Sequence, residues 1–176
     1  MLVKNLEDKL DFNQYGEDAC KKCYQSAIKL IARKDYSKYK LKNKLLDKGF
    51  QSHLIDDLID ILVDEKYLRE DYYKEARIKG MIYKDYHPTY IHQKMYEEKC
   101  PVTDQEIEDV LALVNTTELD LLTNLIKKKY RIMESLDSSK SDEQKKEKIL
   151  RFVASKGHCP HEARSIINSQ ISEYNH

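Results

Sequence analysis

Glycine and proline are scarce in this sequence, at four and three residues of 176. Because these residues make tight turns and β-hairpins, their scarcity argues for long helices and against a β-rich fold. No run of about 18 apolar residues occurs, so no membrane span is expected. The start, MLVKNLEDKLDF, has no apolar stretch of signal-peptide length. We therefore expect a cytoplasmic protein whose four cysteines are reduced thiols.

The sequence also lacks a net charge, with 31 basic and 31 acidic side chains. The whole chain therefore has no overall attraction to nucleic acid. The charges are nevertheless segregated along the chain. Residues 28–50 contain eight basic and two acidic residues, whereas residues 51–76 contain three basic and eight acidic ones. This separation predicts helices of opposite charge that follow one another.

Apolar spacing and capping residues predict three helices in the first third of the chain. The first runs from about residue 18 to residue 34. Ser37 is a typical N-cap for the second, which ends at Lys48-Gly49 because glycine accepts the left-handed backbone that closes helices. Ser52 starts the third. The buried positions predicted for these helices are Ala19, Cys23, Ala27, Leu30, Ile31, Leu41, Leu45, Ile55, Leu58, Ile59 and Leu62.

The same order of helices returns twice. A helix from about residue 70 to residue 84 precedes one that starts at His87-Pro88, where proline fits the first helical position. Thr103 and Glu106 then have the spacing of a capping box, as do Ser141 and Gln144 in a third set that begins near residue 115. The buried positions predicted here are Tyr73, Ala76, Met81, Ile91, Met95, Ile107, Val110, Leu111, Val114, Leu119, Leu122, Leu125, Ile126, Met133, Ile149, Val153, Ala163, Ile166 and Ile167.

These sets look like copies of one unit, because Lys-Asp-Tyr occurs at 34–36 and again at 84–86 ahead of the same apolar spacing. Three pairs recur at offsets of 50 and 108 residues: Leu41/Leu45, Ile91/Met95 and Ile149/Val153. Chance alignment of amphipathic helices is the alternative. We predict an all-α fold of about nine helices in three tandem three-helix repeats, with an elongated or curved body. The predicted segments are a lead-in at 1–17 and repeats at 18–66, 67–115 and 116–176.

Residues 27–68 resemble the first repeat of the RecX regulators of the bacterial recombinase RecA. The matching residues are Ala27, Leu30, Arg33, Tyr36-Ser37, Leu41, Lys44-Leu45, Lys48-Gly49, Ile55 and Lys66-Tyr67-Leu68. His87-Pro88 with Ile91 is similar to a motif of the second repeat, and the resemblance runs from about residue 19 to residue 171. The chain departs from the family pattern in three places. Leu68-Arg69-Glu70 replaces Leu-Asp-Asp, His87 replaces a glycine, and Lys99-Cys100 replaces Lys-Gly.

This resemblance implies a non-catalytic protein that lodges in the groove of a RecA filament on single-stranded DNA. There it would damp ATP hydrolysis, strand exchange and the SOS co-protease activity. It implies the RecA filament as partner, DNA as a weaker one, and no cofactor or membrane; we expect a monomer. The residues that we expect to contact the partner are Arg33, Lys34, Tyr36, Lys38, Lys42, Lys44, Arg77, Lys79, Lys84, Tyr90 and Lys94. The alternative interpretation is that these residues form an ordinary solvated helix face.

Three patterns that could carry other chemistry are weaker. Asp56, Asp57, Asp60 and Asp64 lie at helical spacing and favour a solvated face that pairs with the basic helix of its own repeat. The CKKC at 20–23 and the HCPH at 158–161 have cysteines and histidines near metal-site spacing, but Cys23 is typical of a small core residue and we expect no metal. No glycine-rich phosphate loop is present, because the four glycines lie far apart. We therefore expect no enzyme.

Two other classes of protein compete with this interpretation. Three-helix units with a basic helix also resemble the helix-turn-helix modules of DNA-binding transcription regulators. The acidic third helices argue against that class, since a helix that reads the major groove should not repel phosphates. A plain helical scaffold is the remaining alternative.

Overall fold

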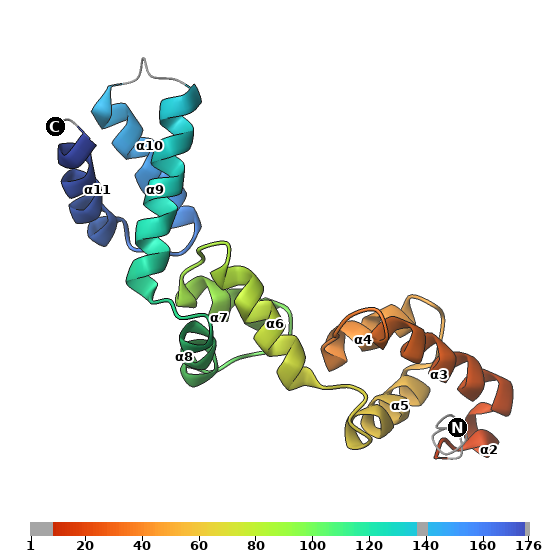
Figure 1. The fold of residues 1–176 in the computed structure, drawn as a ribbon. Coiled ribbons are helices and arrows are strands. Elements are labelled where there is room, and N and C mark those ends of the chain that lie inside the picture. Colours follow the sequence, from red (N-terminus) through yellow and green to blue (C-terminus); the bar gives the residue numbers. More distant parts are fainter. Residues whose placement is uncertain (1–8, 137–140, 175–176) are drawn as a thin grey trace. The chain divides into compact units, whose positions relative to one another are not determined.

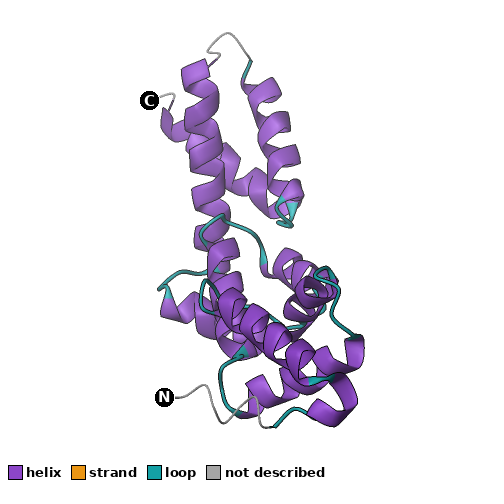
Figure 2. Cartoon of the chain, turned by 90° about the vertical axis from the view of Figure 1, so that its right-hand side faces the viewer, coloured by secondary structure: helices purple, strands orange, loops and turns teal. Residues whose placement is uncertain are grey.

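The computed structural model describes residues 9–136 and 141–174, in which helices and short loops occur and strands do not (Figure 1). The helices are α2 Phe12–Tyr15, α3 Glu17–Ile31, α4 Lys38–Leu46, α5 Ser52–Asp64, α6 Glu70–Ile82, α7 Pro88–Glu97, α8 Asp104–Leu113, α9 Glu118–Leu136, α10 Asp142–Ser155 and α11 Pro160–Tyr174. Figure 2 shows the same chain turned by 90°, with helices in purple and loops in teal. The predicted all-α fold is confirmed. No helix of this described part is long and apolar enough to cross a membrane.

The predicted helix starts are present. The Ser37 hydroxyl accepts a hydrogen bond from the Lys40 N–H at 3.3 Å and thereby begins α4. Pro88 is the first residue of α7. Thr103 and Glu106 form both bonds of a capping box at the start of α8. Each bond satisfies an amide that the helix itself leaves without a partner, so short helices can begin at defined residues.

The helix ends follow the same repeat. Gly49 has φ +87°, the left-handed conformation predicted for it, and Gly157, 108 residues later, has the same φ. Lys99 stands at the corresponding place after α7 and has φ +54°, although it is not a glycine. A left-handed backbone is unfavourable for a residue with a side chain. The turn at Lys99 therefore depends on its surroundings more than the two glycine turns do.

Most positions of the predicted apolar stripes are buried, and five are only half-buried: Ala19, Leu30, Ile31, Val114 and Ile166. Six equivalent positions, two in each set of helices, have no exposed side-chain surface: Leu41, Leu45, Ile91, Met95, Ile149 and Val153. Two predicted core positions are wrong, because Ala76 is exposed and Leu119 is 64% exposed. On α6 the larger Ile78 and Ile82 are buried instead, since they remove more apolar surface from water than alanine does.

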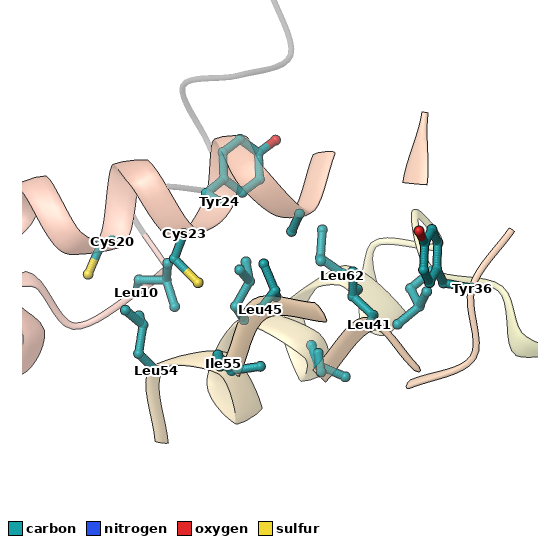
Figure 3. Close-up of a cluster of buried hydrophobic side chains, with 14 residues drawn as sticks. Leu10, Cys20, Cys23, Tyr24, Tyr36, Leu41, Leu45, Leu54, Ile55 and Leu62 are labelled. Atoms are coloured by element: carbon teal, nitrogen blue, oxygen red, sulfur yellow. The ribbon is translucent and has the colours of Figure 1, made fainter. Parts of the chain in front are cut away.

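The structure groups into two compact units. One contains the described residues up to Ala76 together with residues 98–100, and the other contains residues 77–97 and those from Pro101 onward. The core of the first unit is built by α3, α4 and α5 around Leu45, Ile55 and Leu62 (Figure 3). A separate cluster in the second unit joins α9, α10 and α11. The three repeat boundaries given above stay a prediction beside this division into two units.

Candidate interaction surfaces

The basic helix α4 is largely neutralised by the protein itself. Lys42 pairs with Asp56 of α5 at 2.5 Å, so the predicted contact between the acidic and basic helices of one repeat exists. Lys40 pairs with Glu98 at 2.7 Å, and Lys44 lies 3.5 Å from Asp47. Pairs this exposed add little stability, but they reduce the positive charge that α4 presents to a partner. Lys42 and Lys44 are therefore weaker attractors of an anionic partner than the sequence indicates.

Cations without an acidic partner gather where α3 passes into α4. Within the described residues, the side chains of Arg33 and Lys38 contact no carboxylate. The Lys34 ammonium lies 4.9 Å from the centre of the Tyr36 ring. Tyr36 itself is buried, so it packs in the core and offers no free ring face to a partner. Arg33, Lys34 and Lys38 form the strongest positive surface of the predicted set in this unit, and we call it the α3–α4 corner.

Lys40 belongs to a three-membered network. Its ammonium donates to the Tyr73 hydroxyl at 2.6 Å and to Glu98 at 2.7 Å, and the Tyr73 hydroxyl also donates to Glu98 at 2.7 Å. Burial lowers the pKa of Lys40, but the bonds to Glu98 and Tyr73 outweigh it, so its pKa is raised. Burial also raises the pKa of Tyr73. The network ties the segment after α7 to the first unit and withdraws Lys40 from partner binding.

The predicted contact residues of the second unit surround an aromatic stack. Tyr90 stacks on Tyr86 with ring centres 4.3 Å apart. The Lys156 ammonium lies 3.7 Å from the centre of the Tyr86 ring, and the Lys94 ammonium lies 5.5 Å from that of Tyr90. A hydrogen bond from Lys156 lowers the pKa of Tyr86. Each ring of the stack thus has a lysine ammonium near it.

The other three predicted cations of this unit are less concentrated. Arg77 and Lys79 are half-buried on α6, and Lys84 is exposed in the connection to α7. The structure therefore divides the predicted residues between the two units. Of these residues, Arg33, Lys34 and Lys38 lie at the α3–α4 corner in one unit, and Lys94 lies beside Tyr90 in the other.

Two connections pack closely in the second unit. The His87 N–H donates to the Lys156 carbonyl at 3.0 Å, and His158 Nε2 lies 2.8 Å from the Asp85 carbonyl. Since a carbonyl only accepts, His158 carries its proton on Nε2. The buried Asp85 carboxylate pairs with Lys128 at 2.6 Å. The α10–α11 connection is thereby fixed to the α6–α7 connection.

Histidines and glutamates line a pocket of about 470 Å³ beside this contact. His87 Nε2 lies 3.2 Å from Glu118, and the His87 and His158 rings meet edge to face with centres 5.1 Å apart. In the described part of the chain, no three His, Cys, Asp or Glu side chains are arranged to hold a metal ion. Burial lowers the pKa of His158, which favours its neutral form and argues against a role as a charged acid.

The CKKC motif lies in the core of the first unit. Cys20 and Cys23 are completely buried, and Figure 3 shows Cys23 on the side of α3 that faces Leu45. Burial raises the pKa of Cys23 to about 12 and also raises that of Cys20. Thiols of this kind are unreactive and pack as small apolar groups. The predicted packing role of Cys23 is confirmed, and Cys100 is buried too.

Three residues near the α3–α4 corner are absent from the predicted set. Lys66, Arg69 and Tyr72 line a pocket together with Lys38. The sequence carries a signal for Arg69, because the RecX pattern has an aspartate at this position. Lys66 matches the RecX pattern, but the sequence does not place it beside Lys38, because its position depends on the backbone turn after α5.

Comparisons with known proteins agree with the helical order. The family model described as RecX, first three-helix domain, matches residues 23–62. The regulatory protein RecX of Vibrio cholerae (strain O395) is 30% identical over 77 residues, which cover 44% of this chain and 51% of that protein. The match thus spans about half the length of this relative. RecX of Haemophilus influenzae (strain Rd) is 24% identical over 84% of this chain and 93% of its own length.

Two further similarities extend over most of the chain. The regulatory protein RecX of Clostridium perfringens (strain 13) is 27% identical over 89% of this chain and 74% of its own length. The crystal structure of RecX from Lactobacillus salivarius aligns with a TM-score of 0.62 and 22% identity, covering 90% of this chain and 97% of that one. At this identity the structural match supports the fold alone. The sequence matches carry the relation to these regulators.

Proposed function

The chain belongs to the RecX family, and from that premise we propose that it regulates the recombinase RecA. In this proposal it binds in the groove of the RecA filament on single-stranded DNA and damps ATP hydrolysis, strand exchange and the SOS co-protease activity. It acts by binding, without catalysis and without a cofactor. The observation that carries the proposal is the similarity to proteins named regulatory protein RecX over 84% and 89% of the chain.

The charge distribution supports a binding role. The α3–α4 corner presents Arg33 and Lys38 without an acidic partner in the described residues, whereas Lys40 and Lys42 are paired internally. Cations that are already paired contribute less to long-range attraction than free ones. We therefore propose that the α3–α4 corner makes the main contact with the anionic surface of the filament in this unit. Lys94 beside Tyr90 is paired with Glu97 at 2.7 Å, so we propose only a weaker second contact there.

The helix-turn-helix alternative is less well supported. In such a module the third helix enters the major groove. Here that helix is α5, on which Asp57, Asp60 and Asp64 are exposed. Carboxylates on this face would oppose the phosphates that dominate affinity for DNA.

The experiment measures ATP hydrolysis by RecA on single-stranded DNA while the protein is added. We expect hydrolysis to fall when the protein is near-stoichiometric with RecA protomers. The variant Arg33→Glu/Lys38→Glu should need several-fold more protein for the same inhibition, because two unpaired cations become repulsive. The control Lys44→Glu changes a lysine that already lies beside Asp47 and should have a smaller effect.

Two outcomes would contradict the proposal, the first as a whole and the second only in its contact surface. One is unchanged hydrolysis at near-stoichiometric protein together with tight, salt-sensitive binding to duplex DNA, which would favour the helix-turn-helix class. The other is inhibition that is equally strong for both charge variants and the wild type, which would remove the α3–α4 corner from the interface.

A further inference from the structure

A pocket of about 550 Å³ opens in the first unit where the start of α4, the end of α5 and the start of α6 meet. Three cationic side chains line it: Lys38, Lys66 and Arg69. Among the described residues, none of the three forms an ion pair with a carboxylate. Every other lysine of α4 does form such a pair. The unpaired positive charge of this region is therefore concentrated at one concave place.

The walls of the pocket are fixed by backbone bonds. Lys66 takes a left-handed conformation with φ +59°, and the following N–H groups of Tyr67 and Leu68 both donate to the Leu62 carbonyl at 2.8 and 2.9 Å. Leu68 is buried in the core of the unit. These contacts close α5 and hold Lys66 beside the start of α6. The fold therefore fixes the backbone position of Lys66, whereas a lysine on an unrestrained loop would have no fixed position.

The acidic residues in the pocket do not cancel its charge. The Glu70 carboxylate accepts the Lys38 N–H at 3.0 Å, so it caps the positive end of α4. Asp71 is the other acidic residue of the lining, and no cation of the described residues pairs with it. A free carboxylate beside three cations does not suit a purely acidic ligand. It suits a ligand that has a phosphate at one end and N–H donors at the other.

An aromatic platform completes the site. The guanidinium of Arg69 lies 3.7 Å from the centre of the Tyr72 ring, and Tyr72 is 48% exposed. Planar groups of this kind stack on nucleobases, and each stacked base contributes substantially to the binding of single strands. Cations for a phosphate, a stacking surface for a base and a carboxylate for an N–H donor of that base are together the elements that recognise a nucleotide.

We propose that this pocket binds a nucleotide, with the phosphate at Lys38 and Lys66 and the base against Arg69 and Tyr72. A free mononucleotide and a nucleotide within a single strand offer the same chemistry, and the experiment below separates them. The inference goes beyond the proposed function and rests on it only for the choice of single-stranded DNA as the macromolecular probe.

The test measures binding of the full chain to fluorescent oligothymidylate, without RecA, over a range of salt concentrations. Lys66→Gln should lower the slope of log affinity against log salt by about 0.7, the value for one phosphate contact with a single strand. Tyr72→Leu should lower affinity roughly 5- to 100-fold at every salt concentration, since it removes stacking but keeps apolar bulk. Circular dichroism confirms that each variant is folded.

Two matched controls isolate the pocket. Lys48→Gln removes an exposed lysine of the same unit, and Tyr67→Leu removes an exposed tyrosine close in sequence, yet neither residue lines the pocket. Both control variants should bind like the wild type. Equal losses in the controls and in the pocket variants would overturn the proposal. A competition assay adds a further check. If polyglutamate displaces the labelled strand as well as the unlabelled strand does, and Tyr72→Leu has no effect, the pocket binds an acidic peptide and the proposal is overturned.

A parallel titration with thymidine monophosphate distinguishes the two sources of the nucleotide. Binding of the monophosphate that is weakened by Tyr72→Leu assigns the pocket to free nucleotides. Binding of the strand alone, with the same dependence on Tyr72, assigns it to single strands. Binding of neither probe overturns the inference. If the protein inhibits RecA but binds neither probe, the proposed function is kept and the nucleotide pocket is rejected. If the protein binds the strand but leaves ATP hydrolysis by RecA unchanged, the pocket is kept and the proposed function is rejected.

Discussion

Gly157 and Gly49 are equivalent residues in the repeat, yet they have different surroundings. Both have φ +87°. A Cβ atom at Gly157 would lie 2.8 Å from the Cβ of Tyr90 and 3.3 Å from its backbone nitrogen, whereas a Cβ at Gly49 would meet nothing within 4 Å. At Gly49 the absence of a side chain serves the turn alone. At Gly157 it also allows the α10–α11 connection to approach the first turn of α7.

Substitution by alanine separates these two roles. Gly49→Ala should cost about 1–2 kcal/mol, because an L-residue is placed in the left-handed region. Gly157→Ala should cost that amount plus about 1–3 kcal/mol for the overlap with Tyr90. Urea denaturation of both variants, followed by circular dichroism, measures the difference. Equal shifts of the two midpoints would mean that Tyr90 moves away freely and that the close contact has no energetic weight.

A contact between two helix connections adds to the apolar packing of the second unit. His158 reaches from the α10–α11 connection to the Asp85 carbonyl, and burial lowers its pKa from the usual 6.5. The charged and titratable groups around it are His87, the Asp85 carboxylate with Lys128, and Glu118. Because the folded state holds His158 neutral, this contact is complete above pH 6.5.

Acidification should therefore weaken the second unit. As the pH falls below about 6.5, the unfolded chain binds a proton at His158 that the folded chain does not, so stability decreases until the lower folded pKa is reached. The slope can reach about 1.4 kcal/mol per pH unit for one proton. Unfolding free energies of the wild type and His158→Gln between pH 7.5 and pH 5 measure it, since glutamine keeps an N–H donor but does not titrate.

His161→Gln is the matched control, because His161 lines the same pocket but is exposed. We expect the pH slope to become shallower in His158→Gln and to change much less in His161→Gln. An unchanged slope in His158→Gln would show that another group of the second unit carries the dependence on pH.

The helices were more predictable from the sequence than the contacts between residues far apart in the chain. Capping at Ser37 and Thr103 and the buried pair Leu41/Leu45 depend on residues within a few positions of each other, which sequence patterns record directly. The pairing of Lys40 with Glu98 joins residues 58 positions apart, and no local pattern indicates it. The prediction from sequence charge was therefore too high for the unpaired charge of α4. It also did not include Lys66 among the contact residues, because the backbone turn after α5 determines where that side chain lies.

The whole chain contains two compact units, and their apolar clusters differ in composition and in helices. The cluster of the first unit contains Leu41 and Leu45, and that of the second contains Ile149 and Val153. Apolar burial is the main source of stability in each cluster. Since no residue belongs to both clusters, the loss of one side chain should act mainly on its own unit.

Leu41→Ala and Ile149→Ala test this independence, because the two residues are equivalent in the repeat and both are completely buried. Each truncation should cost about 2–5 kcal/mol in its unit. Hydrogen exchange measured by mass spectrometry should then show faster exchange in α3–α5 for Leu41→Ala and in α9–α11 for Ile149→Ala, since exchange reports local opening. If either substitution accelerates exchange equally in all of these helices, the two units unfold as one, and the separate clusters do not act as separate sources of stability.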